Sequence, residues 1–107
     1  MSEKRIQHIE RRIERIKEAL RHIGPMRPGS LTRQYKDPEH KTGAYWQISY
    51  TRQMKSRTEY IRGECAVEVR QQVAMYRRFK RLVDRWVDLS IEHSRLTMQI
   101  VEPKATR

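Results

Sequence analysis

The sequence predicts a mostly α-helical protein with one small β-hairpin. Residues 3–23 and 64–99 carry apolar side chains at the alternating three- and four-residue spacing of a coiled coil, and residues 44–62 include a run in which apolar and polar side chains alternate. We therefore expect an antiparallel, coiled-coil-like helix pair with the hairpin packed on the longer helix. Residues 1–101 are expected to form a single domain, followed by a flexible C-terminal tail at 102–107.

An apolar stripe predicts the first helix over its whole length. Its members are spaced by 3, 4, 3, 4 and 3 residues, with charged helix-forming residues between them. Gly24 and Pro25 follow the last member, as is usual where a helix ends. The charges beside the stripe do not select a parallel homodimer, since Arg12 would meet Lys17. The stripe consists of Ile6, Ile9, Ile13, Ile16, Leu20 and Ile23.

The second helix offers this stripe a partner. No Gly or Pro interrupts the segment 64–99, where a second stripe is spaced by 4, 3, 4, 3, 4 and 3 residues. Antiparallel packing would place Ile23 near Phe79, and a wider apolar face remains to cover the middle segment or a second subunit. The stripe consists of Met75, Phe79, Leu82, Trp86, Leu89, His93 and Leu96, and the wider face adds Val69, Val73, Tyr76, Val83, Val87 and Ile91.

The middle segment predicts the hairpin. In AYWQISY, Trp46, Ile48 and Tyr50 share one face, which is typical of a half-buried strand. SRTEYI fits the returning strand, and the turn falls near RQMK without the Asn-Gly pair that favours a tight turn. The preceding KDPEHKTG is expected to be a polar loop. GPMRPGSL lacks the spacing and the lysine of a phosphate-binding P-loop, so we expect a rigid linker with an exposed Arg27.

Charge gives the clearest indication of a partner. The 107 residues include 24 Lys and Arg against 13 Asp and Glu, a net charge of +11, and the pI is near 10.4. Such an excess favours a polyanion such as DNA, RNA or an anionic membrane. No apolar run reaches the ~20 residues that span a bilayer. A role at a membrane surface is the weakest of these, because neither helix combines a bulky Trp, Phe and Leu face with a uniformly basic opposite face. The start of the chain lacks the apolar core of a signal peptide, and a cytoplasmic location is expected.

Residues with catalytic or metal-binding chemistry do not form a recognisable group. The four histidines are far apart, and no carboxylate pair or nucleophile-base pair is evident. His93 falls in the second stripe, where a partly buried core residue is expected. Cys65 has no second cysteine with which to form a disulfide, and it is expected to be a small buried apolar residue. We expect no enzymatic activity, no cofactor and no metal site.

The chain carries three motifs in order: GPMRPGSLTRQY, HKTGAYWQISY and VRQQVAMYRRFKRLVDRW. Together they resemble a family of small uncharacterised bacterial and archaeal proteins, over residues 24–96, and the first motif is the specific one. Members often lie near transposase-like genes, so the resemblance implies a mobile-element or nucleic-acid context. Their loop commonly carries a cysteine cluster that looks able to bind zinc. The matching YKDPEHKTGAY keeps His40 but has no cysteine, so no metal role is carried over.

The basic residues point to a nucleic-acid surface. Residues 24–63 hold 8 basic and 3 acidic side chains beside aromatic residues, which suits contact with phosphates and bases. We expect a non-catalytic accessory protein that binds DNA or RNA, in the context of a mobile element. The alternatives are a helical interaction or homo-oligomerisation module and an inhibitor that docks on a larger nucleic-acid enzyme. The predicted contact residues are Arg52, Lys55, Arg57, Arg62, Arg70, Arg77, Arg78, Arg81, Arg27 and Arg33.

Overall fold

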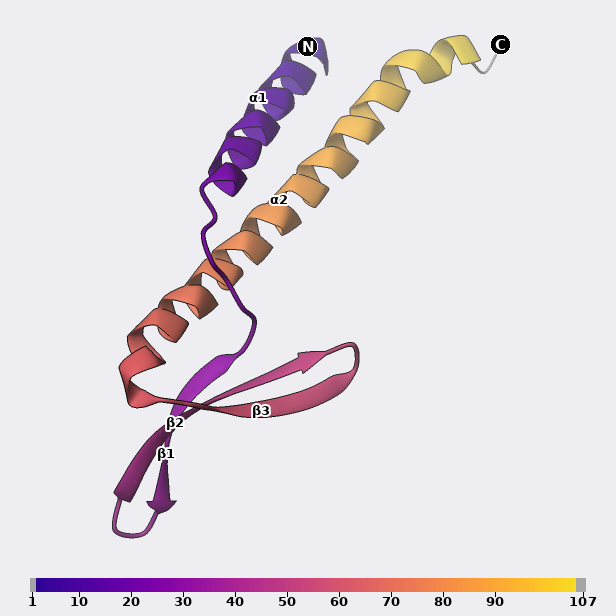
Figure 1. Ribbon diagram of the computed structural model, residues 1–107. Helices are drawn as coiled ribbons and strands as arrows, with labels where there is room; N and C mark the ends of the chain where they lie inside the picture. Colours follow the sequence, from indigo (N-terminus) through magenta and orange to yellow (C-terminus); the bar gives the residue numbers. More distant parts are fainter. Residues whose placement is uncertain (1, 106–107) are drawn as a thin grey trace. The chain divides into compact units, whose positions relative to one another are not determined.

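The computed structural model describes residues 2–105, with side chains described for residues 2–101. Its elements are α1 (Ser2–Arg21), β1 (Ser30–Asp37), β2 (Thr42–Arg52), β3 (Lys55–Ile61), a short 3-10 helix η1 (Gly63–Cys65) and α2 (Ala66–Ala105) (Figure 1). Contacts divide the chain into a helix-pair unit, which comprises α1 and α2 from Phe79 on, and a sheet unit, Gly24–Arg78. Residues 106 and 107 of the expected tail lie outside the described residues.

The helix-pair unit is built on the two predicted apolar stripes. Ile9 is 1 % exposed and forms a buried cluster with Ile16 and Leu89. The two helices run antiparallel, as predicted, because partners early in α1 meet residues late in α2 (Figure 1). The cluster is completed by partly buried residues from both stripes: Ile13, Leu20, Leu82, Trp86 and Leu96.

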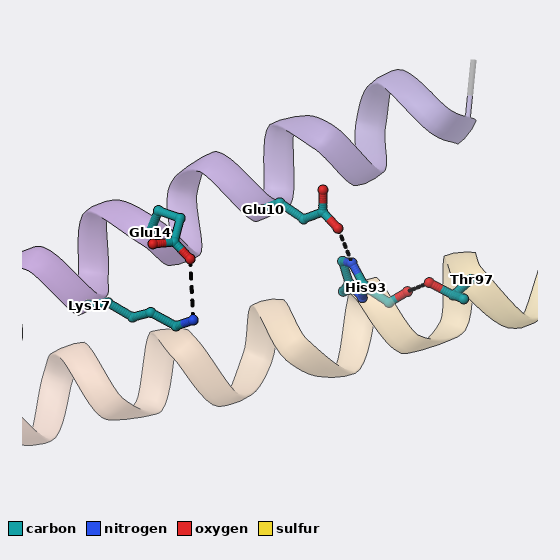
Figure 2. A network of polar contacts seen from close by, with 5 residues as sticks. All are labelled: Glu10, Glu14, Lys17, His93 and Thr97. Atoms are coloured by element: carbon teal, nitrogen blue, oxygen red, sulfur yellow. Dashed lines mark hydrogen bonds and ion pairs between the residues drawn. The ribbon is translucent and has the colours of Figure 1, made fainter.

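Polar contacts along the seam match this antiparallel register. Arg5 pairs with Glu92, and Glu10 Oε2 lies 2.9 Å from His93 Nε2. Figure 2 shows the second contact reaching from α1 to α2, whereas Lys17 bonds Glu14 within α1. His93 is half-buried, and its stripe position is explained by this bond across the pair.

Truncating Ile16 to alanine should lower the free energy of unfolding by about 2–5 kcal/mol, because the change removes buried methyl groups and leaves a cavity. Ile16 is 7 % exposed and belongs to the buried cluster of the helix pair. Arg15→Ala is the matched control, since the Arg15 side chain is exposed and its removal leaves no buried cavity. Urea unfolding of both variants measures the difference, and equal midpoints would contradict the packing.

The sheet unit contains three antiparallel strands in the order β1-β2-β3, so the prediction of a two-stranded hairpin was wrong by one strand. β2 and β3 are the predicted hairpin. β1 covers the last two residues of the expected linker and the first two of the expected polar loop KDPEHKTG, which is reduced to the turn between β1 and β2. Its register pairs Leu31 with Ile48 and Arg33 with Trp46. The strand was missed because the face shared by Leu31 and Arg33 mixes apolar and charged side chains, which hides the alternation of a half-buried strand.

The sheet packs on the first part of α2 only at the base of the hairpin. Ile48 is 0 % exposed and clusters with Ile61 of β3 and with Val69 and Val73 of α2. Cys65 packs beside them and is partly buried. Residues 51–60 are all exposed, so the expected packing of the hairpin on the long helix holds for its base and not for its turn half.

The GPMRPGSL segment is tied to both the sheet and α2. Gly29 has φ +138° and lies so close to Ile48 that a Cβ atom at Gly29 would be 2.7 Å from Ile48 Cγ1. The Arg27 N–H donates a hydrogen bond of 3.2 Å to the carbonyl oxygen of Gln72 in α2. The segment therefore acts as a fixed linker, and Arg27 is half-buried, although an exposed side chain was expected.

Candidate nucleic-acid interface

The β2–β3 hairpin extends beyond the end of β1 as a two-stranded ribbon. β1 pairing with β2 ends at Ser30 and Ser49, whereas β2 and β3 continue to pair as far as Arg52 and Lys55. We call residues 50–57 the arm (Figure 1). Apart from Tyr50, every residue of the arm is exposed. The arm therefore offers both of its faces and its tip to a partner.

The tip of the arm is a two-residue turn. Gln53 and Met54 have φ values of +53° and +64°, as a type I′ turn requires. Neither residue is the Asn or Gly that such a turn favours, and for this reason only the approximate position of the turn was predictable. Met54 is 91 % exposed. An apolar side chain thus stands at the end of the arm, which sequence reasoning did not single out.

One face of the arm collects the positive charge. Arg52 pairs with Lys55, and Arg57 pairs with Tyr50. Because directly paired residues and residues two apart point to the same face, the three cations lie together on the face that also bears Ile48. None of them forms a hydrogen bond or an ion pair among the described residues.

The opposite face of the same ribbon is uncharged. Hydroxyl groups meet across the strands, with Ser49 Oγ 3.3 Å from Thr58 Oγ1 and Thr51 Oγ1 3.2 Å from Ser56 Oγ. Nearer the base of the sheet, the rings of Tyr45 and Tyr60 lie on this face with centroids 6.5 Å apart. The arm is therefore basic on one side and neutral on the other.

Glu59 is the only acidic residue of the hairpin, residues 42–61. It accepts a hydrogen bond from the Tyr50 hydroxyl, and Arg27 Nη2 lies 3.3 Å from its Oε2. The bond from Tyr50 lowers the pKa of Glu59, and the nearby Arg27 and Arg57 lower it further. The same bond raises the pKa of Tyr50 above its ordinary value. The carboxylate is thus ionised at neutral pH and offsets part of the charge that Arg27 brings to the base of the arm.

Replacing Glu59 by glutamine should bring the pKa of Tyr50 back toward its ordinary value, because the hydroxyl no longer faces a carboxylate. Glu59 has a lowered pKa, so its stabilising effect is present above its unfolded pKa and is lost as the pH falls through its folded pKa. In the variant this loss of stability in acid should be smaller. Tyrosine titration followed by ultraviolet absorbance measures the first effect, and Tyr50→Phe identifies the transition.

An unchanged tyrosine titration in Glu59→Gln would contradict the bond between the two side chains. The substitution also removes the one negative charge of the hairpin, which raises its net charge by one, and releases Arg27 from its ion pair. If the hairpin binds a polyanion, Glu59→Gln should therefore bind more tightly than the parent and show a steeper dependence on salt. Weaker binding by this variant would count against a polyanion contact here.

The remaining predicted contact residues fall into smaller groups. The Arg70 guanidinium lies 5.2 Å from the centre of the Trp46 ring, and Arg33 is paired with Trp46 across the strands. Arg33 also lies over Tyr35, at 5.8 Å. Arg62 forms an ion pair with Glu64 at 3.5 Å. Nine of the ten predicted residues belong to the sheet unit, and Arg81 belongs to the helix-pair unit. Arg77 and Arg78 are exposed on the part of α2 that belongs to the sheet unit.

Residues 2–105 hold no cluster of metal ligands and no membrane-spanning helix. Within residues 2–105, no three His, Cys, Asp or Glu side chains gather as metal ligands, and His40 Nδ1 instead lies 2.8 Å from Asp37 Oδ2 in the β1–β2 turn. No helix in this part of the chain is long and apolar enough to cross a membrane. A surface hollow beside Lys36 and Ala44 is lined by the two paired tyrosines.

No family model, curated protein or solved structure matches the chain. The resemblance to the motif-defined bacterial and archaeal family therefore stays a prediction. The charge and the geometry of the arm are the features of the molecule that bear on its function.

Proposed function

We propose that the protein is a small, basic, non-catalytic accessory protein that binds nucleic acid, with the arm as its main contact. The observation that carries this proposal is the grouping of Arg52, Lys55 and Arg57 on one face of an exposed ribbon. Side chains on a regular ribbon keep a defined spacing, so the three cations meet successive phosphates with less loss of conformational freedom than charges on a loose segment.

The shape of the arm suits a groove. A two-stranded β-ribbon fits the major groove of a duplex, and backbone contacts from its cations release counterions. Met54 at the tip is 91 % exposed and offers an apolar contact to base edges, such as the thymine methyl group in the major groove. Arg33 and Arg70 around Trp46 lie on the same face of the sheet and extend the basic surface. Arg62, Arg77 and Arg78 are its outer members in this proposal, and Arg81, which belongs to the helix-pair unit, is a separate predicted contact.

The proposed context is a mobile genetic element, in keeping with the resemblance of residues 24–96. The sequence and the arm do not choose between DNA and RNA, so the test uses both. Binding of the full chain to duplex DNA, single strands and structured RNA is measured by electrophoretic mobility shift over a salt series. We expect binding at low salt with a log–log slope of about −0.9 per phosphate contacted on duplex DNA.

The absence of binding to all three ligands at low salt would overturn the proposal. A second candidate function, a helical interaction or homo-oligomerisation module, is favoured by a separate observation: Val87, Met98 and Val101 of α2 are exposed. A protein partner recovered by affinity purification after nuclease treatment, together with no nucleic-acid binding, would select that function. A partner that is itself a nucleic-acid enzyme would indicate the inhibitor or cofactor role.

A further inference from the structure

The helix-pair unit leaves one apolar face of α2 uncovered. Val87, Ile91, Met98 and Val101 are exposed to 51 %, 45 %, 55 % and 54 %. With the partly buried Val83 they form what we call the outer stripe, spaced by 4, 4, 7 and 3 residues and interrupted only by Ser94. At 1.5 Å per residue the stripe runs for roughly 27 Å. Single exposed apolar residues are ordinary, but five in line along one helix mark an interface.

The outer stripe is separate from the surface that packs on α1. Leu82, Trp86 and Leu89 contact α1, and at 3.6 residues per turn they lie roughly 140° around the helix from the outer stripe. α1 therefore cannot cover both faces of α2. The outer stripe needs a different partner.

Charges beside the outer stripe indicate what this partner is. On one flank lie Asp84 and Asp88, followed by Arg95, and all three are exposed without an ion pair among the described residues. On the other flank lie Ser90 and Thr97, which are uncharged. The flank thus carries acids toward the N-terminal end of the stripe and a base toward its C-terminal end.

We propose that the outer stripe binds the outer stripe of a second copy of this chain, with the two helices antiparallel. In an antiparallel pair the same flank of each helix meets, so Asp88 of each copy faces Arg95 of the other and two symmetric ion pairs form. The two-fold axis then falls between residues 91 and 92. Ile91 packs near its own counterpart, and Val83 packs near Val101 of the other copy. This inference is independent of the proposed nucleic-acid function.

A parallel pair does not satisfy these charges. In that arrangement the charged flank of one helix meets the neutral flank of the other, and Asp88 would lie beside Ser90 or Thr97 instead of Arg95. The charge order therefore selects the antiparallel dimer, and it does so with residues of the helix-pair unit alone.

Disulfide cross-linking tests the register. Single cysteines are introduced into Cys65→Ala, at Ile91, at Val83, at Val101 and, as an exposed control on the same helix, at Val67. We expect oxidation to cross-link Ile91→Cys alone, and to cross-link Val83→Cys only when it is mixed with Val101→Cys. Cross-linking of Val83→Cys by itself would show a parallel pair and overturn the proposed register. Equal cross-linking of Val67→Cys would show random collision.

Sedimentation equilibrium of the parent chain gives a second readout that needs no substitution. We expect a monomer–dimer equilibrium, weakened about tenfold by Asp88→Arg, which turns two attractions into two repulsions. The double variant Asp88→Arg/Arg95→Asp restores both pairs with the charges exchanged and should return to the affinity of the parent. A monomer at every concentration would overturn the proposal and leave the stripe to a different protein. A dimer whose affinity is unchanged by Asp88→Arg would overturn the register.

Discussion

Gly29→Ala should lower the free energy of unfolding by about 2–5 kcal/mol, because two costs add at this position. The residue has φ +138°, where an L side chain is strained. A Cβ atom would also lie 2.7 Å from Cγ1 of Ile48 and 3.1 Å from the carbonyl oxygen of Ser49. Ile48 is 0 % exposed, so moving its side chain aside disturbs the core of the sheet unit. Either the linker leaves the sheet or the core of the sheet unit shifts.

Gly24→Ala is the matched control, since the two glycines lie at opposite ends of the same linker. A Cβ atom at Gly24 meets no atom within 4 Å, and this residue has no positive φ. Its substitution should change the free energy of unfolding by less than about 0.5 kcal/mol. Urea unfolding compares both variants with the parent. Equal midpoints for all three would mean that Gly29 does not approach Ile48 as described.

The same linker shows where sequence reasoning succeeds and where it ends. Gly24 and Pro25 were predicted to end the first helix, and α1 ends at Arg21, just before them. That signal is local and needs only the propensities of neighbouring residues. The role of Gly29 is different, because it depends on Ile48, which lies 19 positions further along the chain. No local pattern reports such an approach.

The helix pair was predictable because its signal is periodic. Ile9, Ile16 and Leu89 were named members of the two stripes, and they form the buried cluster. β1 was not predictable in this way, since a strand at the edge of a sheet is stabilised by hydrogen bonds to its neighbour more than by its own pattern. Its face carries Arg33 and Tyr35 beside Leu31. From the local sequence alone these side chains predict a polar linker, and the strand is evident only from its pairing with β2.

The sequence predicted the charged residues of the candidate site, but not how these residues pair across β2 and β3. Arg52, Lys55 and Arg57 were selected by sequence, and cross-strand pairing brings them to one face. Arg27 was selected for the same reason, yet it bonds Glu59. Only the register, which pairs Glu59 with Ile48 on the basic face, shows that this acid lies among the cations. A count of the predicted basic residues alone therefore overestimates the net positive charge on this face of the hairpin, because Glu59 offsets the charge of Arg27.

Changing Arg52, Lys55 and Arg57 together to glutamine should weaken binding to duplex DNA on the order of 10²–10³-fold at 0.1 M salt, if each contacts one phosphate. Each lost contact reduces the log–log salt slope by about 0.9, so the slope should fall by about 2.7. Binding of the parent and the variant should then converge near 1 M salt, where counterion release no longer contributes. The fold should be kept, because all three side chains are exposed and lie outside the buried cluster.

The matched control removes three positive charges from a different surface. Lys4, Arg11 and Arg15 are exposed on α1 and form no ion pair among the described residues. Lys4→Gln/Arg11→Gln/Arg15→Gln has the same net charge as the arm variant, so long-range attraction falls equally in both. If the arm is the contact, the α1 variant should keep nearly the slope of the parent. Equal losses in the two variants would mean that net charge, and not the arm, determines binding, and an arm variant with the slope of the parent would exclude the arm as the contact surface.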